Sequence, residues 1–254
     1  MGTREAVALP LLPLLLLACT AVHAAQLPPY LSKCPARERV QFNECVLRQA
    51  QKAVDHLGSQ GDRKFGLSPT DPIEFPLIET DSNGFTLKFI NLKIATDPPQ
   101  AYKVDSVDMD LDRKHLDFAY SAPALNMLSK YETDGRILIV PVKGDGEALL
   151  RIDGYKAKFS ADFDVVKNKQ DGLDYVKLKN TKYSSDVSKV SYNFTNLFNG
   201  DQTLGKATND FLNSNWKDVF EETKWSTFEA IRQFMTSQIQ NFFDRVSYNE
   251  AFAQ

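Results

Sequence analysis

Residues 207–246 read ATNDFLNSNWKDVFEETKWSTFEAIRQFMTSQIQNFFDRV and contain no proline or glycine. An uninterrupted helix of about 30 residues would be roughly 45 Å long. The large apolar side chains recur mostly at intervals of three and four, which is the spacing of one helical face: Phe211, Leu212, Trp216, Val219, Phe220, Phe228, Ile231, Met235, Ile239, Phe242 and Val246. The stretch therefore predicts one long amphipathic helix that needs an equally long apolar partner.

The middle of the chain has a different period. From Ile73 to Thr195 apolar and polar residues alternate, for example over residues 85–94, 104–112, 156–165 and 176–179, as in strands with one face in water. Residues 81–84, 133–135, 144–146 and 170–172 have the composition of tight hairpin turns. Residues 137–142 are apolar at odd and even positions, which favours a strand covered on both faces. We therefore predict a long antiparallel meander.

A short helix is expected before the sheet. It should open between Cys34 and Arg39, with Pro35 in its first turn, and end at Gly58. An apolar sheet face of this size must be buried, and only the C-terminal helix is long enough to cover it. The predicted fold is α+β: a strongly curved antiparallel sheet around a long C-terminal helix, with the short N-terminal helix at one end. No repeat or linker divides residues 25–254, so we expect a single domain.

The first 24 residues have the features of a secretory signal peptide. A basic residue lies near the start, an apolar core follows, and Val22-His23-Ala24 ends the segment with small residues. We expect cleavage after Ala24 or Ala25. The alternative, a membrane anchor, is disfavoured because the apolar core is short and contains two prolines. The mature protein is therefore expected to be secreted and soluble, without stable insertion into a membrane.

Two cysteines, Cys34 and Cys45, remain after cleavage. An even pair on an oxidising route favours a disulfide, and the alternative of a zinc site lacks both the ligand spacing and the histidine partners. Asn193-Phe194-Thr195 is an N-glycosylation sequon, which places Asn193 in water. The net charge of −3 argues against nucleic acid as a partner.

Catalytic motifs are not found in the sequence. It contains neither a zinc-protease helix motif, nor a nucleophile elbow, nor a glycine-rich phosphate loop. His115 lies near Asp112 and Asp117 in a predicted strand, and we interpret it as a surface residue because catalysis needs an arranged set of partners. We therefore expect no catalytic residues and no cofactor, which makes an enzyme the least favoured class.

One acidic run imitates a calcium loop. Asp108, Asp110 and Asp112 have the starting spacing, but the loop requires glycine at its sixth position and glutamate at its twelfth. The chain has Arg113 and Ala119 there. We interpret the run as the wet face of a strand and expect no metal site.

Several motifs together resemble the insect takeout and juvenile hormone binding protein family, over nearly the whole mature chain. They are the cysteine pair Cys34 and Cys45, LSPTDP at 67–72, GRILIVPVKGDG at 135–146, NLFNGDQTLG at 196–205 and NDFLNSNW at 209–216. The resemblance implies a tubular lipid-binding fold and a secreted carrier of juvenile hormones, terpenoids or other lipids. The C-terminal pattern is more similar to the takeout branch, which implies a link to circadian rhythm.

We predict a non-catalytic, monomeric carrier that holds a small hydrophobic ligand in an internal apolar tunnel. The candidate lining residues are Phe89, Leu138, Val140, Phe228, Ile231 and Met235, with Tyr131 as a polar group that orients the ligand. The alternative for each of them is a place in a filled core, which is the default because protein interiors are close-packed. A secreted protein with a filled core that signals through its surface is the first alternative. A membrane-engaging binder like the bactericidal permeability-increasing proteins is the second, which the net charge disfavours.

Overall fold

The architecture was analysed in a computed structural model that describes residues 26–36, 38–82 and 84–253. The predicted signal peptide lies outside the described residues. The elements, in chain order, are β1 (Cys34–Pro35), α1 (Arg39–Leu57), β2 (Ile73–Ser82), β3 (Phe85–Asp97), β4 (Lys103–Asp110), β5 (His115–Ile137), β6 (Val140–Lys167), β7 (Asp174–Asp186), β8 (Lys189–Phe194), the short 3-10 helix η1 (Phe198–Gly200), α2 (Gln202–Ser214), α3 (Trp216–Phe243), α4 (Tyr248–Ala251) and β9 (Phe252–Ala253).

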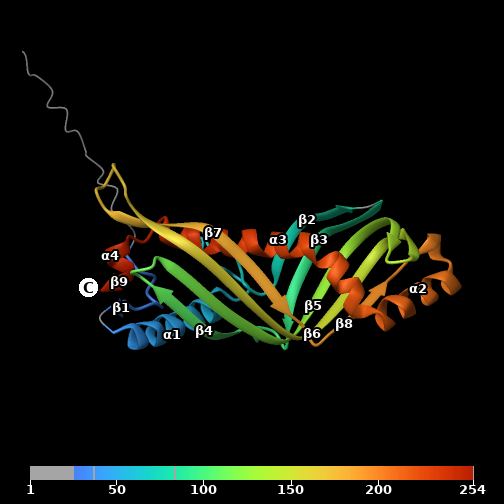
Figure 1. Ribbon diagram of the computed structural model, residues 1–254, viewed down its shortest axis with the longest axis horizontal. Coiled ribbons are helices and arrows are strands. Elements are labelled where there is room, and N and C mark those ends of the chain that lie inside the picture. The colour runs from blue at the N-terminus through green and yellow to red at the C-terminus, as the bar shows by residue number, and fades with distance from the viewer. Residues whose placement is uncertain (1–25, 37, 83, 254) are drawn as a thin grey trace, which may run out of the picture.

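A seven-stranded antiparallel sheet is built on the long β5–β6 hairpin. The two strands contain 23 and 28 residues and pair from His115↔Asp162 to Ile137↔Val140. At about 3.3 Å per residue, β5 alone spans roughly 75 Å. One half of the sheet has the order β4-β5-β6-β7, and the other half has the order β2-β3-β5-β6-β8. The sheet is therefore long, curved and open, as Figure 1 shows.

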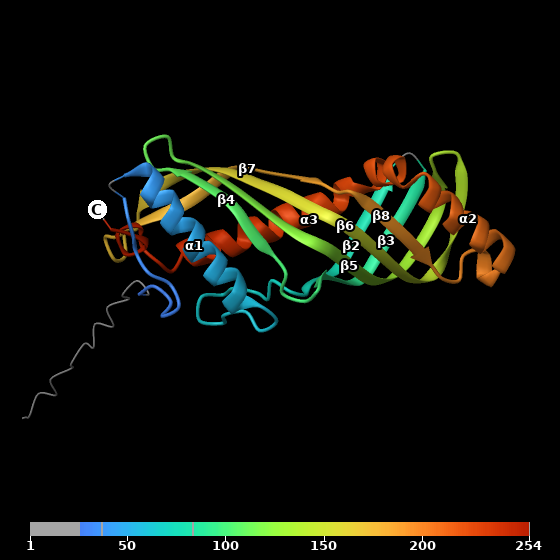
Figure 2. The same ribbon diagram turned by 90° about the horizontal axis from the view of Figure 1, so that it is seen from below.

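Helix α3 runs along the inside of this sheet and contacts β2, β7 and β8. Its 28 residues correspond to about 42 Å. Gln240 fixes the helix to β7: its side chain accepts a hydrogen bond from the Leu178 amide at 2.8 Å and donates one to the Val176 carbonyl at 3.1 Å. Figure 2 shows α1 beside β4 at one end of the molecule and α2 at the other. The predicted fold class is confirmed.

The predicted single helix over residues 207–246 is wrong in one respect, because Asn215 divides it. Asn215 has φ −112° and ψ 28°, and its side-chain amide donates to the Phe211 carbonyl at 2.9 Å. Helix α2 also begins before the predicted start, at Gln202, where the Asp201 carboxylate caps it by accepting from the Leu204 amide.

The N-terminal helix is confirmed, but it begins at Arg39 and Pro35 lies outside it. Cys34 and Pro35 form β1, which pairs in parallel with β9. The predicted disulfide joins Cys34 to Cys45 in α1. The helix ends at Gly58, as expected. The bond and the β1–β9 pair bring the N-terminal segment, α1 and the C-terminal end together.

Two of the four predicted turns, at residues 133–135 and 144–146, are wrong. Both segments lie inside long strands, and the chain reverses instead at Leu138–Ile139, within the stretch predicted to be a strand. The glycines allow close backbone approach. A Cβ on Gly135 would lie 2.3 Å from the Gly84 carbonyl oxygen, and one on Gly146 would lie 2.6 Å from that of Thr195.

The apolar interior consists of two clusters. One surrounds β3, β8 and the start of α3 and includes Leu92, Leu150 and Leu212, and the other lies between α1, β4 and the end of α3 and includes Phe42 and Val246. Partly buried residues such as Phe118 pack against both clusters. Each cluster encloses one of the cavities described next.

Candidate functional site

The larger of two apolar cavities lies under α1, and we call it the large cavity. Its volume is about 280 Å³. Positions 46, 50, 53 and 57 of α1, which share one helical face, form one wall. The remaining wall comes from the N-terminal segment, β4, β5 and the end of α3, with Leu27, Val107, Phe118, Phe234, Met235 and Phe242 among the lining residues.

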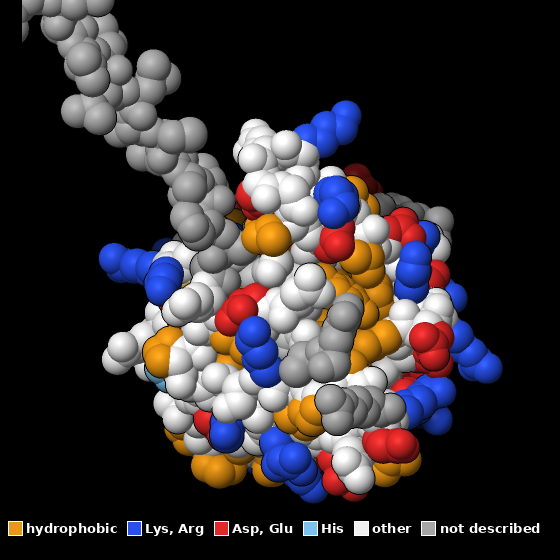
Figure 3. All heavy atoms as spheres, turned by 90° about the vertical axis from the view of Figure 1, so that its left-hand side faces the viewer, with side chains coloured by type: hydrophobic (Ala, Val, Ile, Leu, Met, Phe, Trp, Pro, Cys, Tyr) orange, Lys and Arg blue, Asp and Glu red, His pale blue; other side chains and the backbone are white. Residues whose placement is uncertain are grey.

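This cavity has the size and chemistry of a binding site for a small apolar molecule. An engineered apolar cavity of about 150 Å³ is large enough to bind benzene, so the large cavity accommodates a bigger molecule. Its few polar lining side chains, such as Gln49 and Gln238, include no charged residue. At the end of the molecule that contains α1 and β9, Figure 3 shows apolar side chains gathered beside lysine, arginine, aspartate and glutamate side chains.

The second cavity, which we call the tyrosine cavity, lies between β3, β5–β8 and the middle of α3. Its volume is about 70 Å³, and its lining includes Tyr102, Tyr120, Tyr155, Tyr183 and Tyr192. The phenol oxygens of Tyr155 and Tyr183 lie 2.5 Å apart, and those of Tyr120 and Tyr155 lie 3.4 Å apart. Burial raises the pKa of Tyr120 and Tyr155 well above 10. The phenols are therefore neutral hydrogen-bonding groups at physiological pH.

The two cavities lie next to each other along β5 and α3. On β5, Phe118 lines the large cavity and Tyr120 lines the tyrosine cavity, and their ring centroids are 5.5 Å apart. On α3, Ile231 lines the tyrosine cavity and Phe234 lines the large one. A single helix and a single hairpin therefore supply walls to both cavities.

Four of the seven candidate lining residues lie at these cavities. Phe89, Phe228 and Ile231 line the tyrosine cavity, and Met235 lines the large cavity. The structure thus distributes the candidates over two sites. Their contact with a ligand stays a prediction.

The other three candidates lie elsewhere. Leu138, which is 37% exposed, occupies the β5–β6 turn, and Val140 follows that turn at the start of β6. Tyr131 is buried, but its hydroxyl donates to the Thr195 carbonyl at 2.6 Å, so the protein itself uses that polar group. Leu138, Val140 and Tyr131 are thus not among the described residues that line the two cavities, and their contact with a ligand stays a prediction.

Two sets of lining residues were not predicted from the sequence: the α1 wall of the large cavity and the tyrosines of the tyrosine cavity. Val46, Ala50 and Ala53 have helical spacing. Tyr120 and Tyr155 lie on strands in which buried and exposed residues alternate. That periodicity identifies inward-facing positions. It does not separate a cavity wall from a filled core, because the two use the same side chains.

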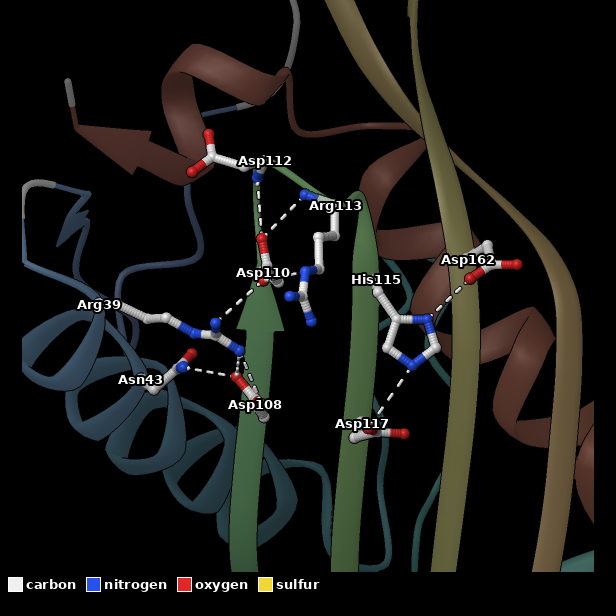
Figure 4. Close-up of polar contacts among 9 residues, drawn as sticks. All are labelled: Arg39, Asn43, Asp108, Asp110, Asp112, Arg113, His115, Asp117 and Asp162. Carbon is white, nitrogen blue, oxygen red and sulfur yellow. Dashed lines mark hydrogen bonds and ion pairs between the residues drawn. The ribbon is translucent and has the colours of Figure 1, made fainter.

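The acidic residues of β4 form ion pairs with arginine side chains of the protein (Figure 4). Arg39 donates to Asp108 at 2.8 Å and lies 3.0 Å from Asp110. The Asp110 carboxylate also accepts from the Arg113 amide. These contacts lower the pKa of Asp110, with the Arg113 amide as the main cause. The run therefore fixes the start of α1 to strand β4.

His115 lies among polar groups on the outer face of the sheet (Figure 4). Its Nδ1 lies 2.7 Å from Asp162 Oδ1, and its Nε2 lies 3.3 Å from Ser160 Oγ. The hydrogen bond to Asp162 raises the pKa of His115. The atoms follow the order of a Ser-His-Asp triad, yet none of the three residues lines either cavity. The arrangement pairs β5 with β6 on the solvent side.

Other functional features were examined over the described part of the chain. No group of histidine, cysteine, aspartate and glutamate in residues 26–36, 38–82 and 84–253 is suited to a metal ion. The same residues include no helix with the length and apolarity to span a bilayer. Asn193 of the sequon is exposed, so a glycan would have access to it.

Comparison with known proteins places this geometry in a family. Residues 13–253 match the protein family described as haemolymph juvenile hormone binding protein (JHBP). The circadian clock-controlled protein daywake of Drosophila melanogaster is 23% identical over 244 residues, which cover 92% of this chain and 91% of daywake. The crystal structure of Epiphyas postvittana takeout 1 superimposes with a TM-score of 0.78 at 25% identity, covering 88% of this chain and all of takeout 1. The chain therefore belongs to the haemolymph juvenile hormone binding protein family.

Proposed function

We propose that the protein is a secreted, non-catalytic carrier that encloses a small hydrophobic molecule, such as a juvenile hormone-like terpenoid or another lipid. The observation that carries the proposal is the apolar lining of the large cavity, whose volume is about 280 Å³. Transfer of apolar surface from water into such a site is favourable by about 25 cal/mol per Å². The family match supports the same function.

Recovery of the natural ligand is the direct test. The full-length chain would be expressed in insect cells, purified from the medium and extracted with organic solvent for mass spectrometry. We expect a lipid-like molecule in stoichiometric amount, and we expect a fluorescent apolar probe, N-phenyl-1-naphthylamine, to bind the extracted protein. Failure to recover any lipid, combined with no binding of the probe, would reject the carrier function and favour action through the surface.

Secretion is tested in the same preparation. The disulfide between Cys34 and Cys45 supports passage through an oxidising compartment. We expect the secreted protein to begin at Ala25 or Gln26. We also expect removal of N-linked glycans to lower its mass, unless Asn193 is changed to Gln. A protein retained in the cells with its apolar N-terminal segment intact would contradict secretion.

A further inference from the structure

The tyrosine cavity contains a buried hydroxyl that has no partner. Tyr192, on β8, is 6% exposed and lines this cavity. Its hydroxyl oxygen is buried without a hydrogen-bond partner among the described residues. The Ser185 Oγ atom of β7, which lines the same cavity, also lacks a partner of good geometry there, but it lies close enough to Tyr183 for its hydroxyl to oppose the rise that burial causes in the pKa of that phenol. A buried polar group without a partner costs about 1–3 kcal/mol. Such a group therefore requires an explanation.

The neighbouring aromatic residues show how unusual this is. Tyr131 donates its hydroxyl to the Thr195 carbonyl, and Tyr155 is bonded to Tyr183. The Tyr192 ring is stacked on Phe194 with a centroid distance of 6.4 Å, whereas the Tyr131 ring meets Phe194 edge-on at 4.8 Å. The ring is thus held in place by the protein, while its hydroxyl group remains available.

The charges around the cavity restrict what could bind there. Lys224 is the one charged residue among the described residues that line it. Its Nζ atom is already 2.5 Å from Glu221 Oε2 and lies over the rings of Phe220, Trp225 and Phe228 at 5.1 to 5.6 Å. A cationic ligand group would be buried without a counter-charge, and a carboxylate would have to displace Glu221 from Lys224. An uncharged group requires neither.

We infer that Tyr192 and Ser185 form a hydrogen-bonding subsite for an uncharged oxygen group, a carbonyl or a hydroxyl, at one end of an otherwise apolar ligand. The inference rests on the proposed carrier function. A volume of about 70 Å³ holds a small functional group, since one water molecule occupies about 30 Å³ of liquid. The hydrocarbon part of the ligand then extends towards the large cavity.

The test is Tyr192→Phe, which removes the hydroxyl and keeps the ring. Displacement of N-phenyl-1-naphthylamine would be measured with four ligands of equal chain length: tetradecane, tetradecanol, methyl tetradecanoate and sodium tetradecanoate. The quantity compared is the ratio of the dissociation constants of variant and wild type for each ligand, because this ratio cancels differences in ligand hydration. We expect ratios of roughly five to ten for the alcohol and the ester, and ratios below about two for the alkane and the carboxylate.

Tyr131→Phe is the matched control, because its hydroxyl is bonded within the protein. We expect its melting temperature to fall by about 2–4 °C, with ratios near one for all four ligands. The melting temperature of Tyr192→Phe should not fall, since its hydroxyl has no partner. Ser185→Ala, a second variant, should weaken the same two ligands.

The outcomes separate this inference from the carrier function. If the probe and all four ligands fail to bind wild-type protein, the carrier function itself is rejected. If they bind but both variants leave the four ratios equal, the subsite is rejected and a water molecule satisfies the hydroxyl. A ratio that rises for the carboxylate alone would reject an uncharged group in favour of an acid.

Discussion

Replacement of Ala53 by leucine should fill part of the large cavity. Ala53 lies on the face of α1 that lines this cavity, and leucine is a good helix former. The change adds three carbon atoms that are removed from water, worth about 0.8 kcal/mol each, or roughly 2 kcal/mol in total. For a domain of this size that corresponds to an increase in melting temperature of about 4–8 °C. Differential scanning calorimetry of ligand-free protein measures the shift.

The same substitution should weaken ligand binding, because the new side chain occupies space that the ligand uses. We expect the dissociation constant of N-phenyl-1-naphthylamine to rise by about tenfold, which corresponds to about 1.4 kcal/mol. Ala207→Leu, on an exposed position of α2, is the control and should change the melting temperature by less than about 2 °C. A lower melting temperature for Ala53→Leu alone would show that the space is filled and refute the reasoning.

Three further predictions concern the scaffold. Gly146→Ala would place a Cβ atom 2.6 Å from the Thr195 carbonyl oxygen, so we expect a loss of about 2–3 kcal/mol in urea unfolding. Asn213→Ala removes a side chain that accepts from and donates to the backbone of β8 at 2.8 Å each; faster amide exchange in β8 and a loss of about 1–3 kcal/mol should follow. The pKa of His115 is raised by Asp162, so its contribution to stability is fully present below about pH 6.5 and is lost as pH rises through the folded-state pKa. His115→Gln should remove that part of the pH dependence, and a folded-state pKa at or below 6.5 in an NMR titration would contradict the assignment.

The alternating strands were predictable because one face of the sheet is wet and the other is buried. Local pattern carries that information, and it sufficed for the fold class. The continuation of β5 through Gly135 and of β6 through Gly146 was not predictable in the same way. A glycine that reverses the chain and a glycine that admits a neighbouring backbone have the same local sequence. Only the long-range approach of Gly84 and Thr195 to these strands separates the two cases.

The division of the C-terminal helix at Asn215 has a similar cause. The apolar spacing continues across the break, from Leu212 to Val219, so periodicity alone predicts one helix. The break lies at Asn215, whose backbone has φ −112° and ψ 28°. A side-chain bond to the carbonyl four residues earlier does not distinguish this residue, because Asn213 makes the same bond and remains helical. Asn213 also bonds to Tyr192 of β8, and a tertiary contact of this kind is not visible in the local spacing.

For the candidate site, the sequence predicts which positions face inwards, but not which of them line a cavity. Phe228, Ile231 and Met235 were found because helical spacing places them towards the sheet. Tyr131 was selected for its polar group, whereas the tyrosine with a free hydroxyl is Tyr192. Which buried phenol lacks a partner depends on backbone atoms of distant strands, as the bond from Tyr131 to Thr195 illustrates. No local pattern in the sequence encodes that difference.

If the proposed carrier function holds, the position of α3 between the two cavities gives the ligand site two walls of different chemistry. Ile231 and Phe234 are three residues apart on the helix and line different cavities. The large cavity is apolar, so the free energy that it contributes scales with the hydrocarbon surface buried there. The tyrosine cavity contributes through hydrogen bonds, whose strength depends on the functional group and not on chain length. The double variant Ala53→Leu/Tyr192→Phe should therefore lose the sum of the two single losses in binding free energy, provided that the two residues contact different parts of the same ligand.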